Sequence, residues 1–438
     1  MAEFELAKLL ARLEESQRAS PSAIAAHQIN CLAELLKFAA QHSPYYQHRL
    51  GDPDTIAWKS LPEVLAHLPL LTRQELQKQQ EEINCRAVPG EHGAWAEAKS
   101  SGSTGRMVTV RRTWACMQYW LALTMREHLW HRRDFSKTLA IIRPLIAEND
   151  PERRGVMMSD WGPPASLLYK TGLSCGLNIM TDVAQQAAWL ERCNPHYLLT
   201  FPNNLEALLR IFESKAVRPH NLCQVRTIGE TLPESVRQHC HAVLGVDIID
   251  TYSSQELGVI AAQCPDSGLY HVMEENLVVE VLDDMGNRCG PGEIGRLVVT
   301  DLHNFATPLI RYDTGDYAEV GPVCSCGRGL ATFARIVGRS RNMVMLPDGR
   351  RFWPLVGAYS FRDVAPVSQY QLLQHGLMDV EVRLVVEVAL TSGQEQALAD
   401  IIQRSLGYPF PLRFGYFEHE LPRHSNGKFE EFICLIAS

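Results

Sequence analysis

The chain has 438 residues, of which 46% are hydrophobic, enough to bury a core spread over two or three domains. A formal net charge of −8 argues against a nucleic-acid-binding surface, which is usually basic. No run approaches the roughly 18–20 apolar residues that span a bilayer, and the acidic N-terminus does not resemble a signal peptide, so we expect a cytoplasmic protein with neither nucleic-acid nor membrane partners.

The first half of the chain predicts helices followed by an α/β layered domain. Residues 1–90 have helical apolar spacing, with a second helix over 29–40. The β-branched segment 107–110 predicts a strand, and 115–131 predicts a helix. Residues 135–260 alternate short apolar runs with helical patterns, which is typical of a mostly parallel sheet covered by helices.

The second half of the chain is richer in strand patterns. Two β-branched runs, 277–282 and 296–300, flank a turn and predict a β-rich subdomain. Beyond residue 339 a strand, a helix and another strand predict a small α+β unit. We therefore expect an α/β protein with a large N-terminal domain (1–339) of layered, mostly parallel sheets and a small C-terminal domain (340–438).

Three short motifs could together bind a nucleotide. The first is a loop of glycines and hydroxyl residues that could wrap phosphates: Ser100, Ser101, Gly102, Ser103, Thr104 and Gly105. It is not a Walker loop, because no Gly-Lys-Ser/Thr leads into a helix; the alternative is an ordinary turn. The second motif, 311–316, ends in Asp316, and the third is Asn426-Gly427-Lys428.

In this order the motifs resemble those of the acyl-adenylate-forming (ANL) superfamily, in the version found in phenylacetate–CoA ligases. The resemblance covers nearly the whole chain. It extends to further segments in family order: Leu68 to Arg73, Thr200 to Pro202, Gly229-Glu230, Tyr252 to Glu256 and Gly338-Arg339. It implies that residues 1–339 form an adenylation domain and that 340–438 form a mobile domain carrying a catalytic lysine.

The resemblance implies an ATP-dependent ligase. A carboxylic acid would attack the α-phosphate of ATP, giving an acyl-adenylate and pyrophosphate, and coenzyme A would then accept the acyl group and release AMP. Two anions meeting at ~4 Å repel by about 4 kcal/mol at an effective dielectric of 20, so a cation between them matters. By resemblance Lys428 is that cation, and Glu256 holds Mg²⁺, with Thr104 as a second contact.

The resemblance also assigns the nucleotide contacts. Tyr252 would stack on adenine, Glu230 would lie along the purine edge, and Asp316 would accept from both ribose hydroxyls. Arg339 would contact ribose or phosphate. The remaining positions assigned to the nucleotide are Gly229, Asp250, Thr251 and Ser253. The alternative for Asp316 is a simple turn aspartate, because Thr-Gly-Asp is common in turns.

The chain departs from the family pattern at several positions, which leaves the acyl acceptor open. Ser253 replaces the glycine that usually follows the adenine tyrosine, and Arg341 stands where the family commonly has the aspartate pivot of the small domain. The acceptor could be coenzyme A, a carrier-protein thiol or an amine; an amide ligase is the second hypothesis. A catalytically silent ATP-binding scaffold is the third.

The twelve cysteines are scattered, so in a cytosolic chain a disulfide framework is not expected. By resemblance, Cys264, His271, Cys324 and Cys326 would hold a structural zinc, since four thiolate and imidazole ligands suit tetrahedral Zn²⁺. The alternative is a group of buried free thiols.

The resemblance favours an aryl or arylacetic acid as the substrate. Its pocket would lie among residues 130–255, with Trp161, Tyr169, Phe201 and Ile228 as apolar candidates, although each could equally be a core residue. A homodimer is expected from the resemblance alone.

Overall fold

The structure is a computed structural model that describes most of the chain. The described residues are 2–50, 60–99, 107–144, 154–215, 218–339, 342–352, 354, 361, 364–386, 388–423 and 428–436, with the side chains of 2–4 and 352 excepted. The predicted phosphate loop, Ser100 to Gly105, lies outside these residues, as does Arg341 at the predicted pivot.

The chain begins with helices, as predicted. The two long ones are α1 (Ala2–Ser16) and α2 (Pro21–His42), and α2 starts where the Ser20 side chain accepts a hydrogen bond from Ala23 N. Four shorter helices and a 3₁₀ turn follow: α3 (Pro44–Gln47), α4 (Leu61–His67), α5 (Arg73–Lys78), α6 (Gln80–Ile83) and η2 (Gly90–His92). Their buried leucines pack against the antiparallel part of the main sheet.

A hairpin brings the two sides of the predicted phosphate loop together. Strand β1 (Trp95–Lys99) pairs antiparallel with β2 (Thr109–Thr113), so Lys99 lies opposite Thr109. Helix α7 (Trp114–Trp130) follows directly because Thr113 caps it by accepting from Cys116 N.

One sheet of 12 strands, ordered β11-β12-β13-β14-β10-β9-β8-β7-β6-β3-β5-β4, forms the centre of the large unit within the described residues. Residues 135–260 supply its parallel part, in which β5, β3, β6, β7 and β8 are successive parallel neighbours. The parallel strands are β3 (Leu139–Arg143), β5 (Ser174–Asn178), β6 (Tyr197–Thr200), β7 (Gln224–Ile228) and β8 (Asp247–Ser254), and edge strand β4 (Val156–Met158) pairs antiparallel with β5.

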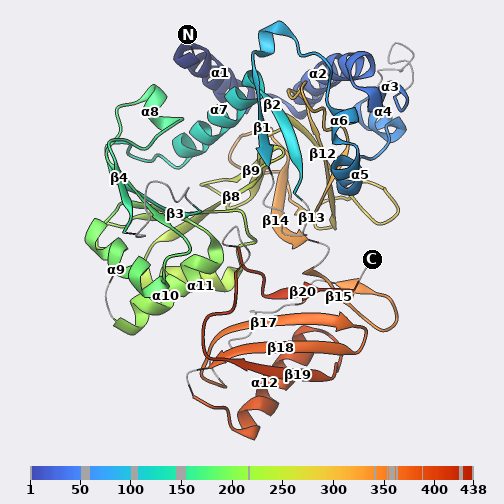
Figure 1. The fold of residues 1–438 in the computed structure, drawn as a ribbon. Coiled ribbons are helices and arrows are strands. Elements are labelled where there is room, and N and C mark those ends of the chain that lie inside the picture. Colours follow the sequence, from blue (N-terminus) through green and yellow to red (C-terminus); the bar gives the residue numbers. More distant parts are fainter. Residues whose placement is uncertain are drawn as a thin grey trace.

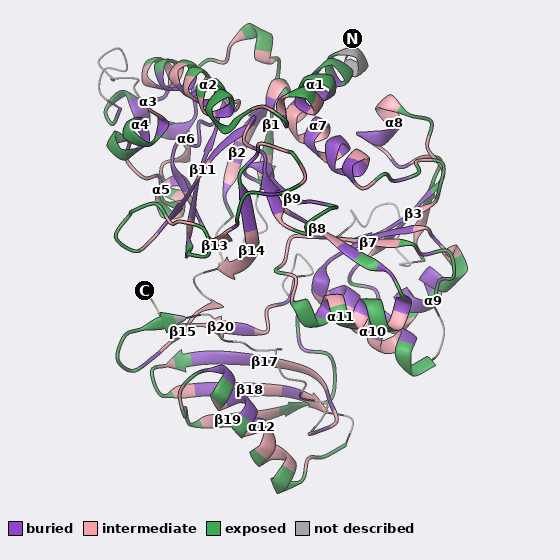
Figure 2. Cartoon of the chain, turned by 180° about the vertical axis from the view of Figure 1, so that it is seen from behind, coloured by how far each residue is buried: buried purple, intermediate pink, exposed green. Residues whose placement is uncertain are grey.

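Helices cover one face of this parallel part. Short helix α8 (Ala165–Leu168) precedes β5, and the covering helices are α9 (Val183–Cys193), α10 (Pro202–Lys215) and α11 (Glu234–Leu244). Their buried sides pack on alternate strand residues such as Ala140, Ile142 and Val225, while their outer sides are exposed (Figure 2).

The rest of the sheet is antiparallel, which is the predicted β-rich region. Its strands are β9 (Gly258–Gln263), β10 (Tyr270–Val272), β11 (Leu277–Leu282), β12 (Ile294–Asp301), β13 (Tyr312–Val320) and β14 (Thr332–Arg339). The parallel and antiparallel regions are therefore halves of one continuous sheet, joined where β8 pairs with β9. This continuity was not evident in the sequence.

The C-terminal residues form a separate sheet with its own core, drawn in orange and red in Figure 1. The sheet has the order β19-β18-β17-β20 and packs against α12. Its elements are β17 (Val367–Gly376), β18 (Asp379–Val386), α12 (Ser392–Ser405), β19 (Leu412–Phe417) and β20 (Phe432–Cys434), and a small ribbon of β15 (Val344–Met345) and β16 (Arg351–Phe352) precedes them. The division at 339/340 stays a prediction. No described helix combines the length and apolar character needed to cross a bilayer.

Candidate active site

Several predicted site residues meet where the C-terminal unit lies against the carboxyl ends of the parallel strands. Strand β7 leads into Gly229-Glu230, β8 carries Tyr252, and the segment before β20 carries Lys428. Ligands of open α/β sheets commonly bind at this edge, because strand ends and loops converge there.

Asp316 accepts hydrogen bonds from two other predicted site residues. Tyr252 donates its hydroxyl hydrogen to Asp316 Oδ2 at 2.7 Å, and Arg339 Nε donates to Asp316 Oδ1 at 3.2 Å. Asp316 and Arg339 are register partners on β13 and β14, which explains why residues 23 positions apart meet. Two side chains that were predicted to contact the same nucleotide therefore hold the Asp316 carboxylate in position.

Two sequence motifs are joined behind this carboxylate. Leu71 N donates to Arg311 O at 2.9 Å, and Asp313 N donates to Leu71 O at 2.9 Å, which adds a bridge beside β13. The Arg311 guanidinium also donates to Leu68 O at 2.7 Å and pairs with buried Glu280 at 2.9 Å. The Leu68 to Arg73 segment and the motif 311–316 are therefore held together by backbone and side-chain hydrogen bonds.

Glu230 connects the large unit to the lysine-bearing segment. Its Oε1 accepts from Phe429 N at 2.9 Å and its Oε2 from Asn203 N at 3.1 Å. Asn203 Nδ2 in turn donates to Phe429 O at 2.7 Å. Burial raises the pKa of Glu230, and these two backbone donors oppose the rise. In this arrangement the residue predicted for the purine edge holds the C-terminal unit in place.

Lys428 directly precedes Phe429, so the contact between Phe429 and Glu230 also positions Lys428. A Cβ built on Gly229, whose φ is +79°, would lie 3.3 Å from Lys428 Nζ, so the ammonium group packs directly over this glycine. Burial, with Arg339, lowers the pKa of Lys428, while Glu230, Asp316 and Glu256 oppose the shift. The structure thus brings Lys428 within electrostatic reach of the three carboxylates named for ATP and magnesium.

Glu256 is buried and its Oε1 lies 3.1 Å from Arg73 Nη1. Arg73 also donates to the hydroxyl of Tyr312 at 3.4 Å. Arg73 had no predicted role, although it ends the Leu68 to Arg73 segment that is part of the resemblance. We infer that it positions Glu256.

Three other predicted contacts lie on β8. Asp250 is buried, and its two oxygens accept from Thr227 Oγ1 at 2.6 Å and Tyr270 OH at 2.9 Å. Thr251 is buried as well, whereas Ser253 is half-buried. The side chain of Asp250 is thus engaged within the sheet, and the nucleotide role of all three stays a prediction.

Cys264, His271, Cys324 and Cys326 lie together, with one potential ligand atom of each within 4.8 Å of the others. His271 Nε2 is 3.2 Å from Cys326 Sγ, and its Nδ1 is 3.4 Å from Leu330 O, a carbonyl that could orient the ring. Burial lowers the pKa of His271 to about 4, so the imidazole is neutral at pH 7, as metal ligation requires. The four side chains could therefore hold a metal ion such as zinc.

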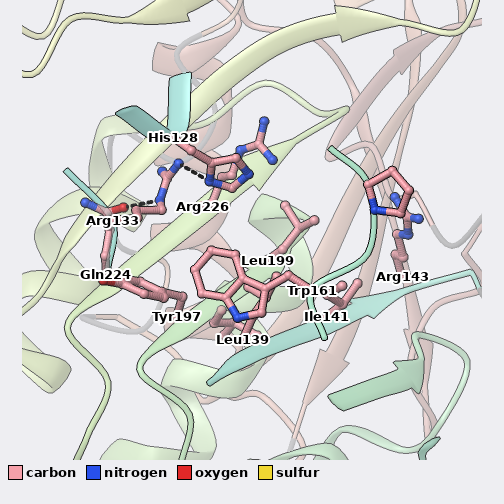
Figure 3. Close-up of a pocket in the computed structure, with 12 residues that line it drawn as sticks. His128, Arg133, Leu139, Ile141, Arg143, Trp161, Tyr197, Leu199, Gln224 and Arg226 are labelled. Carbon is pink, nitrogen blue, oxygen red and sulfur yellow. Dashed lines mark hydrogen bonds between the residues drawn. The ribbon is translucent and has the colours of Figure 1, made fainter. Parts of the chain in front are cut away.

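The four apolar wall candidates have different surroundings. Phe201 lies 3.4 Å from the position of a Cβ on Gly229, next to Lys428, whereas Tyr169 is 43% exposed and stacks on Phe135. Ile228 packs against the helical face of the sheet. Trp161 is buried and lines a pocket on the opposite face, drawn in Figure 3.

Comparison with known proteins gives one consistent relationship. No family model matches the chain. The chain is 25% identical to the phenylacetate–coenzyme A ligase of Thermus thermophilus over 375 residues, covering 82% of this chain and 80% of the relative. It is also 25% identical to the enzyme of the same name from Aromatoleum evansii over 411 residues, covering 90% of each.

Solved structures give the same fold at lower identity. The 2-hydroxyisobutyryl-CoA ligase in its postadenylation state, in complex with 2-HIB-AMP, superposes with a TM-score of 0.73 at 16% identity, covering 95% of this chain and 90% of that one. In its thioesterification state the same enzyme superposes with a TM-score of 0.60.

Proposed function

From the relationship of this chain to the phenylacetate–CoA ligases, within the acyl-adenylate-forming superfamily, we propose that it activates a carboxylic acid with ATP and transfers the acyl group to coenzyme A. The acid's carboxylate oxygen bonds to the α-phosphorus and pyrophosphate leaves. The thiol of coenzyme A then attacks the acyl carbon, loses its proton, and AMP leaves. The single observation that best supports this function is the convergence of Lys428, Asp316 and Glu256 at one edge of the sheet.

Lys428 would act between the two reacting anions. Its Nζ packs over Gly229, at the edge where an acid held near Phe201 would meet the α-phosphate. A positive charge there offsets a repulsion of about 4 kcal/mol, which corresponds to roughly a thousandfold in rate. The depressed pKa favours loss of its proton, but the arriving phosphates would favour the ammonium form.

Asp316 would hold the ribose. Its carboxylate already accepts two hydrogen bonds, from Tyr252 and Arg339, and the same oxygens retain lone pairs for the ribose hydroxyls. Tyr252 would then stack its ring on adenine, and Arg339 would contact the ribose or a phosphate. Glu230, Gly229 and the loop 100–105 complete the proposed nucleotide contacts.

Two metal ions would serve different purposes. Glu256 would hold Mg²⁺ through a carboxylate oxygen; no described residue donates a hydrogen bond to its Oε2. Bound there with ATP, magnesium would neutralise phosphate charge. The four cysteine and histidine ligands would hold Zn²⁺, which would tie the segment after β9 to the loop before β14 and so brace the sheet behind the ATP site.

The acid is proposed to be aryl or arylacetic, and the protein to be cytoplasmic. A homodimer stays a prediction. The acceptor is assigned to coenzyme A because the chain is similar to two phenylacetate–coenzyme A ligases. Amines or a carrier-protein thiol remain the alternatives raised by Arg341.

The experiment is ATP–pyrophosphate exchange with a panel of carboxylic acids. We expect Lys428→Ala to lower exchange at least a hundredfold while ATP still binds, and the exposed control Lys215→Ala to exchange normally. Equal exchange by Lys428→Ala and the parent would reject the role of Lys428. Coenzyme A consumption, compared with trapping by hydroxylamine, then identifies the acceptor.

A further inference from the structure

A pocket of about 150 Å³ lies on the face of the parallel sheet opposite α9, α10 and α11. Residues at alternate positions of three neighbouring strands form its floor, among them Ile141 on β3, Leu199 on β6 and Arg226 on β7. Trp161 and Tyr197 add aromatic walls, with their ring centroids 5.4 Å apart (Figure 3). A cavity of ~150 Å³ is large enough for one benzene ring.

The polar part of this pocket carries an excess of positive charge. Arg133, Arg143 and Arg226 line it, whereas the nearest carboxylate is that of Glu127. Glu127 accepts two hydrogen bonds from Arg133, at 2.8 Å each, and lies 3.1 Å from Arg226 Nε. One buried carboxylate therefore faces two guanidinium groups, and Arg143 adds a third positive charge to the lining of the pocket.

Neighbouring groups do not remove this excess. Arg133 donates to His128 Nδ1 at 3.0 Å, and burial together with Arg133 holds the pKa of His128 well below its usual value, so the ring is neutral. Asp250 also acts on Arg226, but both of its oxygens already accept hydrogen bonds within the sheet.

Two of the arginines are less fully engaged than Arg133. The Nε–H of Arg226 is buried, and its 3.1 Å contact with Glu127 lacks the geometry of a hydrogen bond. Arg143 is exposed at the end of β3, lines the pocket, and forms no ion pair within the described parts of the chain. An anion in the pocket would therefore meet one guanidinium group without an ion-pair partner among the described residues and a second that shares its carboxylate with Arg133.

The strands that line the pocket lead toward the proposed reaction centre. Arg226 lies three residues before Gly229 along β7, a rise of ~10 Å, and Lys428 packs over Gly229. Arg143 is the last residue of β3, at the same carboxyl edge of the sheet. A flat acid whose carboxylate reaches Lys428 can therefore extend along the strands toward Arg226 and Arg143.

We propose that this pocket receives a second anionic group of the acid substrate, paired with Arg143 and Arg226, while the ring lies against Trp161. The enzyme would then select an aryl acid with two acidic groups, such as an aromatic dicarboxylate, over a simple arylacetic acid. This inference rests on the proposed acid-activating function.

The test uses two probes that differ by one carboxylate, phenylacetate and 4-carboxyphenylacetate. Calorimetric titration of the full chain without ATP should show 4-carboxyphenylacetate binding at least tenfold more tightly. In Arg143→Gln the ratio of the two affinities should fall to near one. The matched control Arg192→Gln, exposed on α9 on the other face of the sheet, should keep the ratio of the parent.

Equal or weaker binding of 4-carboxyphenylacetate, no measurable binding of it, or an unchanged ratio in Arg143→Gln would each overturn the inference. ATP–pyrophosphate exchange with both acids separates this result from the proposed function. Preferential binding without exchange from any acid would reject the proposed function and leave the pocket assignment standing. Exchange with no preference between the two acids would reject the pocket assignment alone.

Discussion

Glu127 is the sole carboxylate among the described residues that contacts the arginine cluster behind the pocket, so its neutralisation has a large expected cost. The side chain is fully buried, and although burial opposes it, Arg133 and Arg226 hold its pKa well below the usual value. Glu127→Gln keeps the shape but leaves two buried guanidinium groups without their counterion. Removal of one partner of such a buried pair costs about 3–5 kcal/mol.

This cost can be measured as thermal stability. For a domain of this size about 1 kcal/mol corresponds to roughly 2 °C in Tm, so Glu127→Gln should melt about 6–10 °C below the parent in scanning calorimetry. The matched control is Glu81→Gln, because Glu81 pairs with Arg111 at 3.0 Å with a side chain that is 75% exposed. An exposed pair contributes ~0–1 kcal/mol, so the control should shift Tm by about 2 °C or less.

Two results would refute this reasoning. One is a Tm for Glu127→Gln that is indistinguishable from that of Glu81→Gln, which would mean that the guanidinium groups are solvated or otherwise neutralised. The other is a loss in Glu127→Gln that disappears at 1 M NaCl, because salt screens exposed charges far more effectively than buried ones.

Three further outcomes are expected. Purified protein should contain one zinc per chain, and Cys324→Ala should lose the metal and unfold at lower temperature. Burial raises the pKa of Asp301 to about 6, so ionisation of this carboxyl lowers the free energy of unfolding as pH rises from about 4 through 6. Asp301→Asn should remove this dependence. Measured by urea denaturation, its stability relative to the parent should be higher at pH 7.5 than at pH 5. Gly229→Ala should lower ATP–pyrophosphate exchange at least tenfold, because the added Cβ would lie 3.3 Å from Lys428 Nζ. The control is Gly245→Ala, which should exchange normally. Gly245 also has a positive φ, but its Cβ would have no atom within 4 Å.

A specific result would contradict each of these three expectations. Metal-free protein with an unaltered melting curve in Cys324→Ala would remove the zinc assignment. An equal stability difference between Asp301→Asn and the parent at both pH values would mean that this carboxyl is not the titrating group. Equal exchange losses in the two glycine variants would attribute the effect to backbone strain rather than to Lys428.

The sequence was sufficient for local structure and for the relationship to known ligases. Helices and strands over 115–131, 197–200 and 277–282 were predicted because apolar periodicity reports directly on which faces are buried. The Cys and His ligands were predicted by resemblance, and the structure brings those four side chains together.

Only the tertiary structure decided how separate segments combine. Periodicity carries no information about which strands pair, so it could not reveal that β8 and β9 join two halves into one sheet, or that Arg73 reaches Glu256. Likewise Arg143, Arg226 and Glu127 are unremarkable in sequence, as arginines and glutamates are usually solvated. Their charge becomes informative only when the fold places Arg143 and Arg226 on one small pocket, with buried Glu127 against Arg226.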